Sequence, residues 1–506
     1  MKTVRPPRLG NRCQALLVAA ALAGLAVPAP AQLPTLGDGL EMTSAAERKL
    51  GDRIARELYR DPDLIDDPVL AEYVQGIWQP LLAAARARGE LGAEIDDRFA
   101  WEVLLGRDRT VNAFALPGGY LGVHLGLIAV VGSRDELASV LAHELSHVTQ
   151  RHIARLTSQQ LRQTPLMIGA MILGALAASK NPDAANAVIA GGQAMAIQNQ
   201  LNFSRDMERE ADRIGFGVMT QAGFAPQAFA AMFDKLQQAN RLNDNNAFPY
   251  LRSHPLTTER IADMQARLPA AGGPAAAVPL VPEHAMLTAR ARVLSNPGID
   301  ALRAMASEPD SAAFAGLAPA RQSGVLYAAA LSSARQRDFA RARQWAARLA
   351  TLTASDARAA RQARLLQAEV EWTAGDGART LALLGDATAA RPELMLWTQA
   401  ASRSGQAGAA AQRLQTWVAA HPRDAAAWLQ LAAAQGALGQ TLRAIRSEAE
   451  ARAAQLDYAA AVDRLRGAQN LVRRGEAGRG PGDHIDVSII DTRLRQLESA
   501  LREQAL

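Results

Sequence analysis

The chain has 506 residues, which is long enough for two or three domains with sizeable hydrophobic cores. Its formal net charge of +5 depends on the first 31 residues, which carry four basic side chains and no acid. Without them the charge is about +1, so the charge balance predicts no nucleic-acid partner. The single cysteine, Cys13, also lies in this segment. Because the rest of the chain has no cysteine, it can neither form disulfides nor use a thiol in catalysis.

Residues 1–31 have the three-part layout of a secretory signal. Basic residues come first, an apolar run follows from Ala15 to Val27, and Ala29-Pro30-Ala31 completes the pattern. We expect cleavage after Ala31 and export to the periplasm. No later apolar run reaches the roughly 20 residues that span a bilayer, so the exported protein is expected to be soluble.

Two helices and a small sheet are predicted to open the exported chain. The expected elements are helices at 43–60 and 68–87, β-type runs at 99–105 and 111–117, a turn at Gly118-Gly119 and a further apolar run at 120–130.

The run at 111–117 contains the candidate substrate-binding residues Asn112, Ala113, Phe114, Ala115 and Leu116. An edge strand can pair its backbone with an extended peptide. An ordinary half-buried strand explains the same residues equally well.

A histidine pair with an adjacent glutamate occurs in the sequence HELSH, as His143, Glu144 and His147. Residues 136–142 before it are good helix formers, with Ser133 and Asp135 as candidate N-caps. On a helix, two histidines four residues apart share a face and can bind one metal ion, and the glutamate can take a proton from a water molecule at its open position. The alternative, two surface histidines, is disfavoured by the apolar residues at three- and four-residue steps around them.

Two strongly apolar segments follow, at 166–178 and 187–197. The first is too short to cross a bilayer as a helix. One interpretation is a pair of buried helices. The other is a mobile flap or hairpin over the cleft, with peripheral membrane contact through 166–178.

Residues 202–220 resume helical spacing, with Glu208 and Asp212 four residues apart. Zinc peptidases use three protein ligands and one open position, and two His with one Glu is a known set. We predict Glu208 as the third ligand and Asp212 as the acceptor of a ring N–H from a ligating histidine, with Glu210 pointing elsewhere. A solvated run of charges is the alternative.

His254 precedes Pro255, which disfavours helical backbone at the histidine. An imidazole on such a rigid loop can reach the fourth metal position or the oxyanion of a tetrahedral intermediate. Arg260 can pair with Asp212 or Glu208. For His254 and Arg260 alone, a cap or a surface ion pair is an equally good explanation.

A linker rich in Pro, Gly and Ala at 270–283 predicts a domain boundary. We therefore expect a signal peptide at 1–31, a protease domain at 32–269 and a helical domain at 284–506.

The helical domain carries turn-like marks at Asp338, Asp376, Gln406 and Gln440, spaced by 38, 30 and 34 residues. These spacings lie around the 34-residue period of tetratricopeptide repeats. We predict an α-helical solenoid of about four such repeats that ends in a longer helix near 484–504. An ordinary helical bundle is the alternative.

The segments HELSHVTQRH, SRDMEREADRIG, NAFALPGG and SHPLTTER together resemble the zinc metallopeptidases related to CAAX prenyl endopeptidases. With an export signal and C-terminal repeats, the chain resembles their periplasmic beta-barrel assembly-enhancing protease group. The resemblance is dense over residues 42–265. It implies a mainly α fold with a zincin-like domain of helices and a small β-sheet. It also implies one Zn²⁺ held by His143, His147 and Glu208, with Glu144 as the base. The resemblance places His254 beside the metal, where it either holds the enzyme in check or assists catalysis.

The predicted function is a zinc endopeptidase that hydrolyses misfolded or stalled outer-membrane proteins. Glu144 would take a proton from water and return it to the leaving amine, while His254 would help to stabilise the oxyanion. The expected partners are unfolded or misassembled proteins and the outer-membrane protein assembly machinery, recruited by the repeats. The alternative is a chaperone or scaffold that acts through its repeats while the zinc site is idle or self-inhibited.

Overall fold

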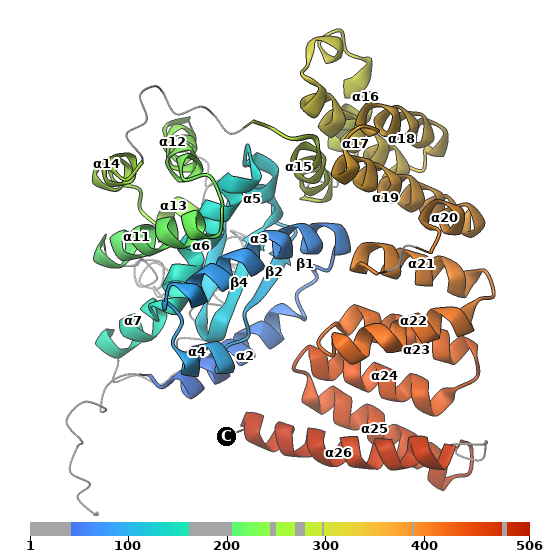
Figure 1. Cartoon of the computed structure of the whole chain (residues 1–506). Coiled ribbons are helices and arrows are strands. Elements are labelled where there is room, and N and C mark those ends of the chain that lie inside the picture. The colour runs from blue at the N-terminus through green and yellow to red at the C-terminus, as the bar shows by residue number, and fades with distance from the viewer. Residues whose placement is uncertain are drawn as a thin grey trace, which may run out of the picture. The chain divides into compact units, whose positions relative to one another are not determined.

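The computed structural model describes residues 42–160, 205–242, 249–268, 279–295, 298–386, 389–477 and 483–505. Over these ranges the protein is mainly helical, with one small four-stranded sheet in the N-terminal part and many stacked helices in the C-terminal part (Figure 1). The predicted fold class is therefore confirmed.

Several predictions concern segments outside the described residues. They are the signal peptide at 1–31, the apolar segments at 166–178 and 187–197, and most of the linker at 270–283. Within the described ranges, no helix combines the length and the apolarity needed to cross a membrane.

The sheet has the strand order β1-β2-β4-β3. Its strands are β1 (Leu64–Ile65), β2 (Glu102–Gly106), β3 (Ala113–Leu116) and β4 (Tyr120–His124). β4 runs parallel to β2 and antiparallel to β3, so β3 lies at an edge of the sheet. Gly118 and Gly119 form the turn between β3 and β4 at φ values of 73° and 85°, which residues with a Cβ rarely adopt.

The apolar run at 120–130, which the sequence analysis left undivided, forms two elements. β4 ends at His124, and α5 (Leu125–Val130) follows as a short helix. The N–H of Gly126 donates to the carbonyl of Asp108, which turns the chain away from the sheet. Short apolar runs do not distinguish a buried strand from a buried helix by their pattern, and this explains the difference.

The two helices predicted before the sheet are present as α2 (Ser44–Leu58) and α3 (Pro68–Ala87). Their N-cap side chains, Thr43 and Asp67, accept hydrogen bonds from backbone N–H groups of the first turn. A short helix that the sequence did not predict, α4 (Ala93–Arg98), lies between α3 and β2.

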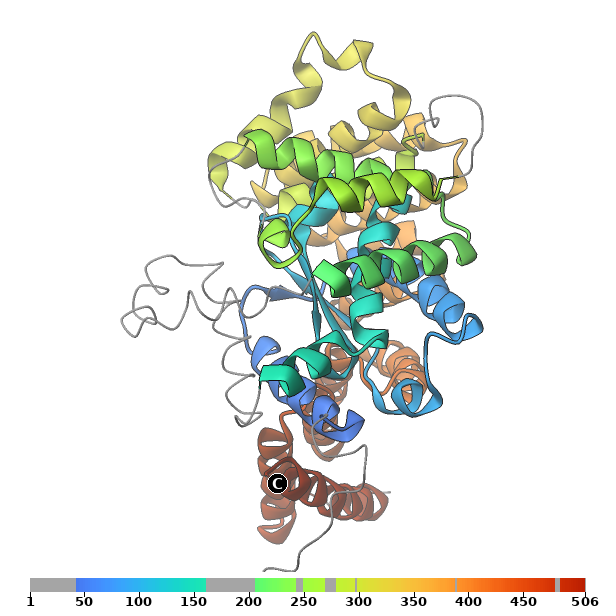
Figure 2. The same ribbon diagram turned by 90° about the vertical axis from the view of Figure 1, so that its left-hand side faces the viewer.

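α6 (Arg134–Thr149) lies at the centre of the N-terminal core and carries the histidine pair. Ser133 caps it, as predicted, by accepting the N–H of Glu136 at 3.1 Å. In Figure 2 the remaining helices of this part lie, together with α6, on the side that faces the viewer. They are α7 (His152–Gln160), α11 (Arg205–Gln221), α12 (Gln227–Leu242), α13 (Tyr250–Ser253) and α14 (Thr258–Ala266).

The C-terminal helices form successive hairpins (Figure 1). The four predicted turn residues, Asp338, Asp376, Gln406 and Gln440, are the N-cap residues of the second helices of four hairpins. The helices are α16 (Ile299–Ser307), α17 (Pro319–Arg335), α18 (Phe339–Thr353), α19 (Ala357–Ala374), α20 (Gly377–Leu384), α21 (Arg391–Arg403), α22 (Ala407–Ala420), α23 (Ala425–Ala437), α24 (Thr441–Ala454), α25 (Tyr458–Arg473) and α26 (Asp483–Ala505). α26 is the longer last helix expected near 484–504, while the tetratricopeptide class of the hairpins stays a prediction.

α15 (Pro282–Ser295) contributes side chains to two hydrophobic cores. Leu287 and Ala291 pack in the core that surrounds α6. Met286 and Val293 pack in the core of the first C-terminal hairpin. All four side chains are fully buried. The helix after the predicted linker is therefore shared, while the predicted domain boundaries themselves stay predictions.

Arginines of three C-terminal helices bind acids at the start of α3. The pairs are Arg290 with Asp67, Arg361 with Glu72 and Arg391 with Asp66, each at 2.6 Å. Each arginine also binds a carboxylate of a following helix, namely Glu369, Glu393 and Asp424.

Candidate metal centre

The three predicted metal ligands converge in the interior of the N-terminal part. α6 supplies His143 and His147, α11 supplies Glu208, and each of these residues is at most 2% exposed. The two Nε2 atoms lie 3.0 Å apart. Glu208 Oε2 lies 3.4 Å from His143 Nε2, and Glu208 Oε1 lies 3.4 Å from His147 Nε2. The four-residue spacing predicted that His143 and His147 share one face of a helix. In the structure this face meets Glu208 of a second helix.

These spacings fit a small divalent cation. Ligands at about 2.1 Å around a tetrahedral ion lie about 3.4 Å from one another. Burial lowers the pKa of His143, but the Asp212 and Glu208 carboxylates beside this imidazole raise it to about 10. Two imidazoles and a carboxylate are also the donor set of peptidase zinc sites. A divalent metal ion satisfies both the geometry and the charge of this group.

His254 joins the same group from the loop after α13. Its Nδ1 lies 3.0 Å from Glu208 Oε1 and 3.3 Å from His143 Nε2. The ligand atoms of His143, His147, Glu208 and His254 all lie within 4.8 Å of one another. The backbone of His254, at φ −123° and ψ 76°, is outside the helical region, as the following proline predicts. The loop therefore brings a third imidazole to the place of a fourth ligand.

Glu144 is fully buried beside the group and is held by the edge strand. Its Oε2 accepts the backbone N–H of Ala115 in β3 at 2.9 Å, and its Oε1 lies 3.4 Å from His254 Nε2. Burial raises the pKa of the Glu144 carboxyl above its ordinary value. A raised pKa suits a group that first accepts a proton and then returns it.

Asp212 and Arg260, the two residues predicted to support the ligands, lie beside His143 and Glu208. Asp212 Oδ1 lies 2.9 Å from His143 Nδ1, the ring nitrogen that faces away from the other ligands. Arg260 binds Asp212 through Nε at 2.6 Å and Nη2 at 2.8 Å, and its Nη1 lies 2.8 Å from Glu208 Oε2. Burial acts to raise the pKa of Asp212, but the bonds from Arg260 and His143 lower it below its ordinary value. The ionised form of Asp212 is therefore favoured beside the outer ring nitrogen of His143.

The pKa of Glu208 is also depressed. Burial acts to raise it, but the adjacent His254 and His143 imidazoles lower it well below its usual range. The third predicted ligand is therefore a carboxylate at neutral pH, as metal binding requires.

His152, which has no assigned role in the sequence analysis, also approaches a ligand, and Glu210 in turn contacts His152. His152 Nδ1 lies 2.9 Å from His147 Nδ1, and His152 Nε2 lies 3.0 Å from Glu210 Oε2. The feature of the sequence that could have indicated His152 is its place as the last residue of HELSHVTQRH, five positions after His147. Glu210 does point away from the metal group, as predicted, and its partner is His152.

One of the predicted substrate-binding residues contacts the candidate site, and the others only take part in the sheet. Ala115 contacts the site through its N–H. The Phe114 ring covers Gly122 of β4, where a Cβ would lie 2.1 Å from the ring. The carbonyl of Asn112 accepts the N–H of His124 at 3.0 Å. Ala113 and Leu116 are buried strand residues, so substrate contact along this strand stays a prediction.

Residues 72–268 match the model of Peptidase family M48. This segment belongs to peptidase family M48. It contains the two histidines, Glu144, Glu208 and His254, so the match confirms the prediction of an HExxH-type metallopeptidase for the M48 segment.

Curated relatives are also similar to part of this chain. The Beta-barrel assembly-enhancing protease of Escherichia coli K12 is 33% identical over 266 residues, 51% of this chain and 53% of the relative. Its counterpart in Vibrio cholerae is 37% identical over 253 residues, 50% of each chain. The Mitochondrial metalloendopeptidase OMA1 of Saccharomyces cerevisiae is 30% identical over 206 residues, 39% of this chain and 56% of the relative. In each match the chain covers only about half the length of the relative.

Proposed function

We propose that the protein is a periplasmic zinc endopeptidase that cleaves misfolded or stalled outer-membrane proteins. The observation that carries the proposal is the convergence of His143, His147 and Glu208 from two helices, with the Glu144 carboxylate buried beside them. A structural zinc site would not need that additional carboxylate. The similarity to the Beta-barrel assembly-enhancing protease of Escherichia coli supports the choice of substrate.

When bound, Zn²⁺ supplies a Lewis acid that acidifies a water molecule and polarises the scissile carbonyl. Glu144 accepts the proton of the attacking water and returns it to the leaving amine. The N–H of Ala115 holds one oxygen of Glu144 in place, and the other oxygen is available for the proton. Asp212 and Arg260 keep His143 and Glu208 oriented.

The edge strand β3 supports an extended substrate. Among the described strands only β4 pairs with it, so its other edge can accept a peptide backbone by strand addition. The N–H of Ala115 on that side binds Glu144. A peptide that pairs next to Ala115 would therefore have its backbone within reach of the base.

The export signal predicted at 1–31 supports a periplasmic location. The C-terminal hairpins support recruitment of substrate or of the assembly machinery, because stacked helical hairpins offer an extended concave surface.

The variant Glu144→Gln tests the proposed function. It keeps the size of the side chain and removes the base, so cleavage of unfolded casein should fall by about 10² to 10⁴-fold. Zinc content, measured by metal analysis of the purified protein, should stay at one ion per chain. Glu57→Gln, which changes a half-exposed glutamate of α2, is the control and should keep full activity. Unimpaired proteolysis by Glu144→Gln would contradict the mechanism.

A chaperone or scaffold is the second candidate, because the C-terminal hairpins have hydrophobic cores of their own. In that case Glu144→Gln protein would support outer-membrane protein assembly as well as the unaltered protein does. The zinc endopeptidase predicts that stalled outer-membrane proteins accumulate in cells that carry the variant.

A further inference from the structure

We propose that His152 and Glu210 are positioning residues that fix the ring of the ligand His147. Together they set which of its nitrogens carries the proton and which faces the metal. The inference rests on the proposed function, because it concerns how the metal ligands are held. It assigns a role to a histidine and a carboxylate that lie outside the ligand set.

The two ligand histidines of α6 are supported differently. The outer nitrogen of His143 lies 2.9 Å from the Asp212 carboxylate. The outer nitrogen of His147 lies 2.9 Å from a second imidazole, that of His152. The far nitrogen of His152 then lies 3.0 Å from the Glu210 carboxylate. Each ligand imidazole is thus connected to a carboxylate of α11, one directly and one through another ring.

This arrangement selects one protonation pattern. His147 can bind a metal through Nε2 only if its proton is on Nδ1. That N–H needs an acceptor, and Nδ1 of His152 can accept only if the His152 proton is on Nε2. The Glu210 carboxylate, which can only accept when ionised, favours that proton position. Glu210 therefore sets the tautomer of His152, and His152 sets that of His147.

The backbone conformation of Arg151 brings His152 to this place. On a continuous helix, a residue five positions after His147 would point about 140° away from it. α6 instead ends at Thr149, Arg151 takes a φ of 51°, and α7 begins at His152. A positive φ is costly for a residue with a side chain and persists where the surroundings enforce it. Here the Arg151 guanidinium is bound by Glu47 at 2.9 Å.

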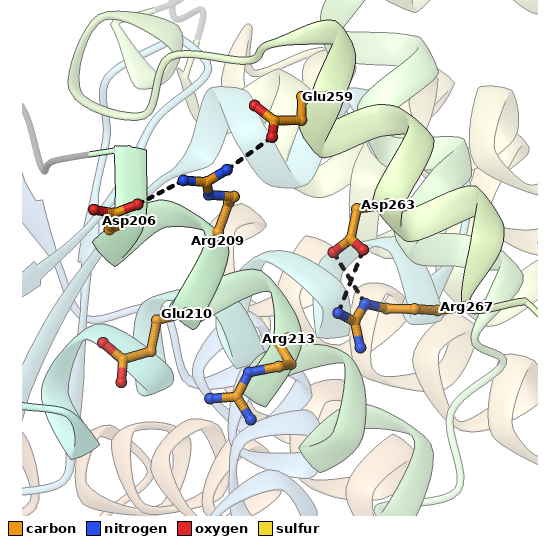
Figure 3. A pocket seen from close by; sticks show the side chains of 7 residues that line it. All are labelled: Asp206, Arg209, Glu210, Arg213, Glu259, Asp263 and Arg267. Carbon is orange, nitrogen blue, oxygen red and sulfur yellow. Dashed lines mark hydrogen bonds and ion pairs between the residues drawn. The ribbon is translucent and has the colours of Figure 1, made fainter.

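Glu210 lies at the surface end of the connection. His152 is fully buried, whereas the Glu210 side chain is 29% exposed and borders a charged hollow of about 520 Å³ between α11 and α14. Figure 3 shows Arg209 bound to Asp206 and Glu259 across this hollow, with no dashed line between Glu210 and the other side chains drawn. Its partners are His152 and, at 2.8 Å, Arg155. The Glu210 carboxylate is thus directed to His152.

Zinc affinity of the full chain, measured by competition with a chromophoric chelator, is the first test. We expect His152→Ala and Glu210→Ala to weaken zinc binding about 10- to 100-fold, the usual effect of losing a residue that orients a ligand. His152→Asn should retain affinity within about threefold, because the amide oxygen can accept near the position of Nδ1. Glu259→Ala, which removes another glutamate of the same hollow, is the matched control and should leave affinity unchanged.

The tautomer of His147 in the metal-free protein is the second test, because loss of folding stability alone would not change it. With ¹⁵N-labelled histidine, NMR of the unaltered protein should report the Nδ1–H form at His147. His152→Ala should shift the ring toward the Nε2–H form, and His152→Asn should restore Nδ1–H. Unchanged zinc affinity or an unchanged tautomer in His152→Ala would overturn the proposal.

The two proposals fail in different ways. If the unaltered chain bound no zinc, or if Glu144→Gln cleaved casein normally, the proposed function would be wrong. If zinc bound and Glu144 were essential while His152→Ala behaved as the unaltered protein, only the positioning role would be lost.

Discussion

Gly215 of α11 lies directly against the backbone of His143 on α6. A Cβ at Gly215 would come within 3.1 Å of the His143 backbone nitrogen and of the Ala142 carbonyl. The absence of a side chain lets the two helices approach closely. Glu208, about two turns earlier on α11, reaches the histidines because of this approach.

Gly215→Val should therefore damage the metal group more than the fold. The branched side chain has to push α11 away from α6, which moves the Glu208 carboxylate relative to both histidines. We expect zinc affinity to fall at least about tenfold and unfolding to become easier by about 1–3 kcal/mol. Chelator competition and thermal unfolding of the metal-free protein measure the two effects.

Gly217→Ala on the same helix is the matched control. Its Cβ would meet only the flexible end of the Arg88 side chain, at 2.5 Å, so this neighbour can move aside. The control should bind zinc as the unaltered chain does. Equal zinc affinities of Gly215→Val and the unaltered protein would refute the role given to the close approach.

His254→Ala should raise the rate of peptide cleavage. With His254 among the ligand atoms, the group offers four protein donors, and four donors leave a tetrahedral ion no open position. Removing the imidazole opens that position to water and substrate. Initial rates of casein cleavage by the variant and the unaltered protein provide the comparison. A lower rate would instead assign His254 to oxyanion stabilisation.

Arg290→Met should destabilise the protein strongly. The Arg290 side chain is 5% exposed and binds Asp67, Glu369 and the Tyr327 hydroxyl. Methionine keeps much of the volume but leaves a largely buried Asp67 without its cation, which costs about 3–5 kcal/mol. Urea unfolding followed by tryptophan fluorescence measures the change. The control Arg303→Met alters a side chain that is 68% exposed and should change stability by less than about 0.5 kcal/mol.

The folding stability of the protein should depend on pH through Asp424, the N-cap residue of α23. Burial acts to raise the pKa of Asp424, but hydrogen bonds from Arg391 and Trp417 lower it below its ordinary value. A carboxyl with a lower pKa in the folded state stabilises the fold above its unfolded pKa, about 3.9. That contribution is lost as the pH falls through the folded pKa.

Asp424→Asn isolates this charge, because asparagine is also a good N-cap and can still accept the N–H of Ala427. At pH 7 the variant should be less stable than the unaltered chain by about 1–3 kcal/mol. At pH 3 the difference should shrink, since the unfolded chain then binds protons at this carboxyl and the stabilising contribution falls. Urea midpoints at pH 7, 5 and 3 track the trend, and a difference that stayed constant with pH would contradict it.

The ligand set could be predicted from the sequence because the chemistry of a metal site requires few residue types at helical spacing. His143, His147, Glu208 and Asp212 each stand four residues from a partner, so a single period placed them on common faces. The capping positions at Asp338 and Asp376 were visible for a similar reason, because they are local.

The remaining features depend on backbone geometry or distant contacts that leave little trace in the sequence. A positive φ is usually indicated by a glycine or an asparagine, but the residue with the positive φ here is Arg151. The placement of His152 therefore could not be predicted from the sequence. β1 is a two-residue strand, too short for a periodic pattern. The sharing of α15 between two cores depends on which helices meet in space.

The shared helix α15 limits where this chain can be joined to segments of other proteins. Leu287 and Val293 lie on one continuous helix but are buried by different neighbours, so a cut at the start of the helix would leave a hole beside α6 as well as beside α17. A chimaera that joins this M48 segment to a foreign helical array should therefore keep the chain through Ser295 and exchange only the helices from α16 onward.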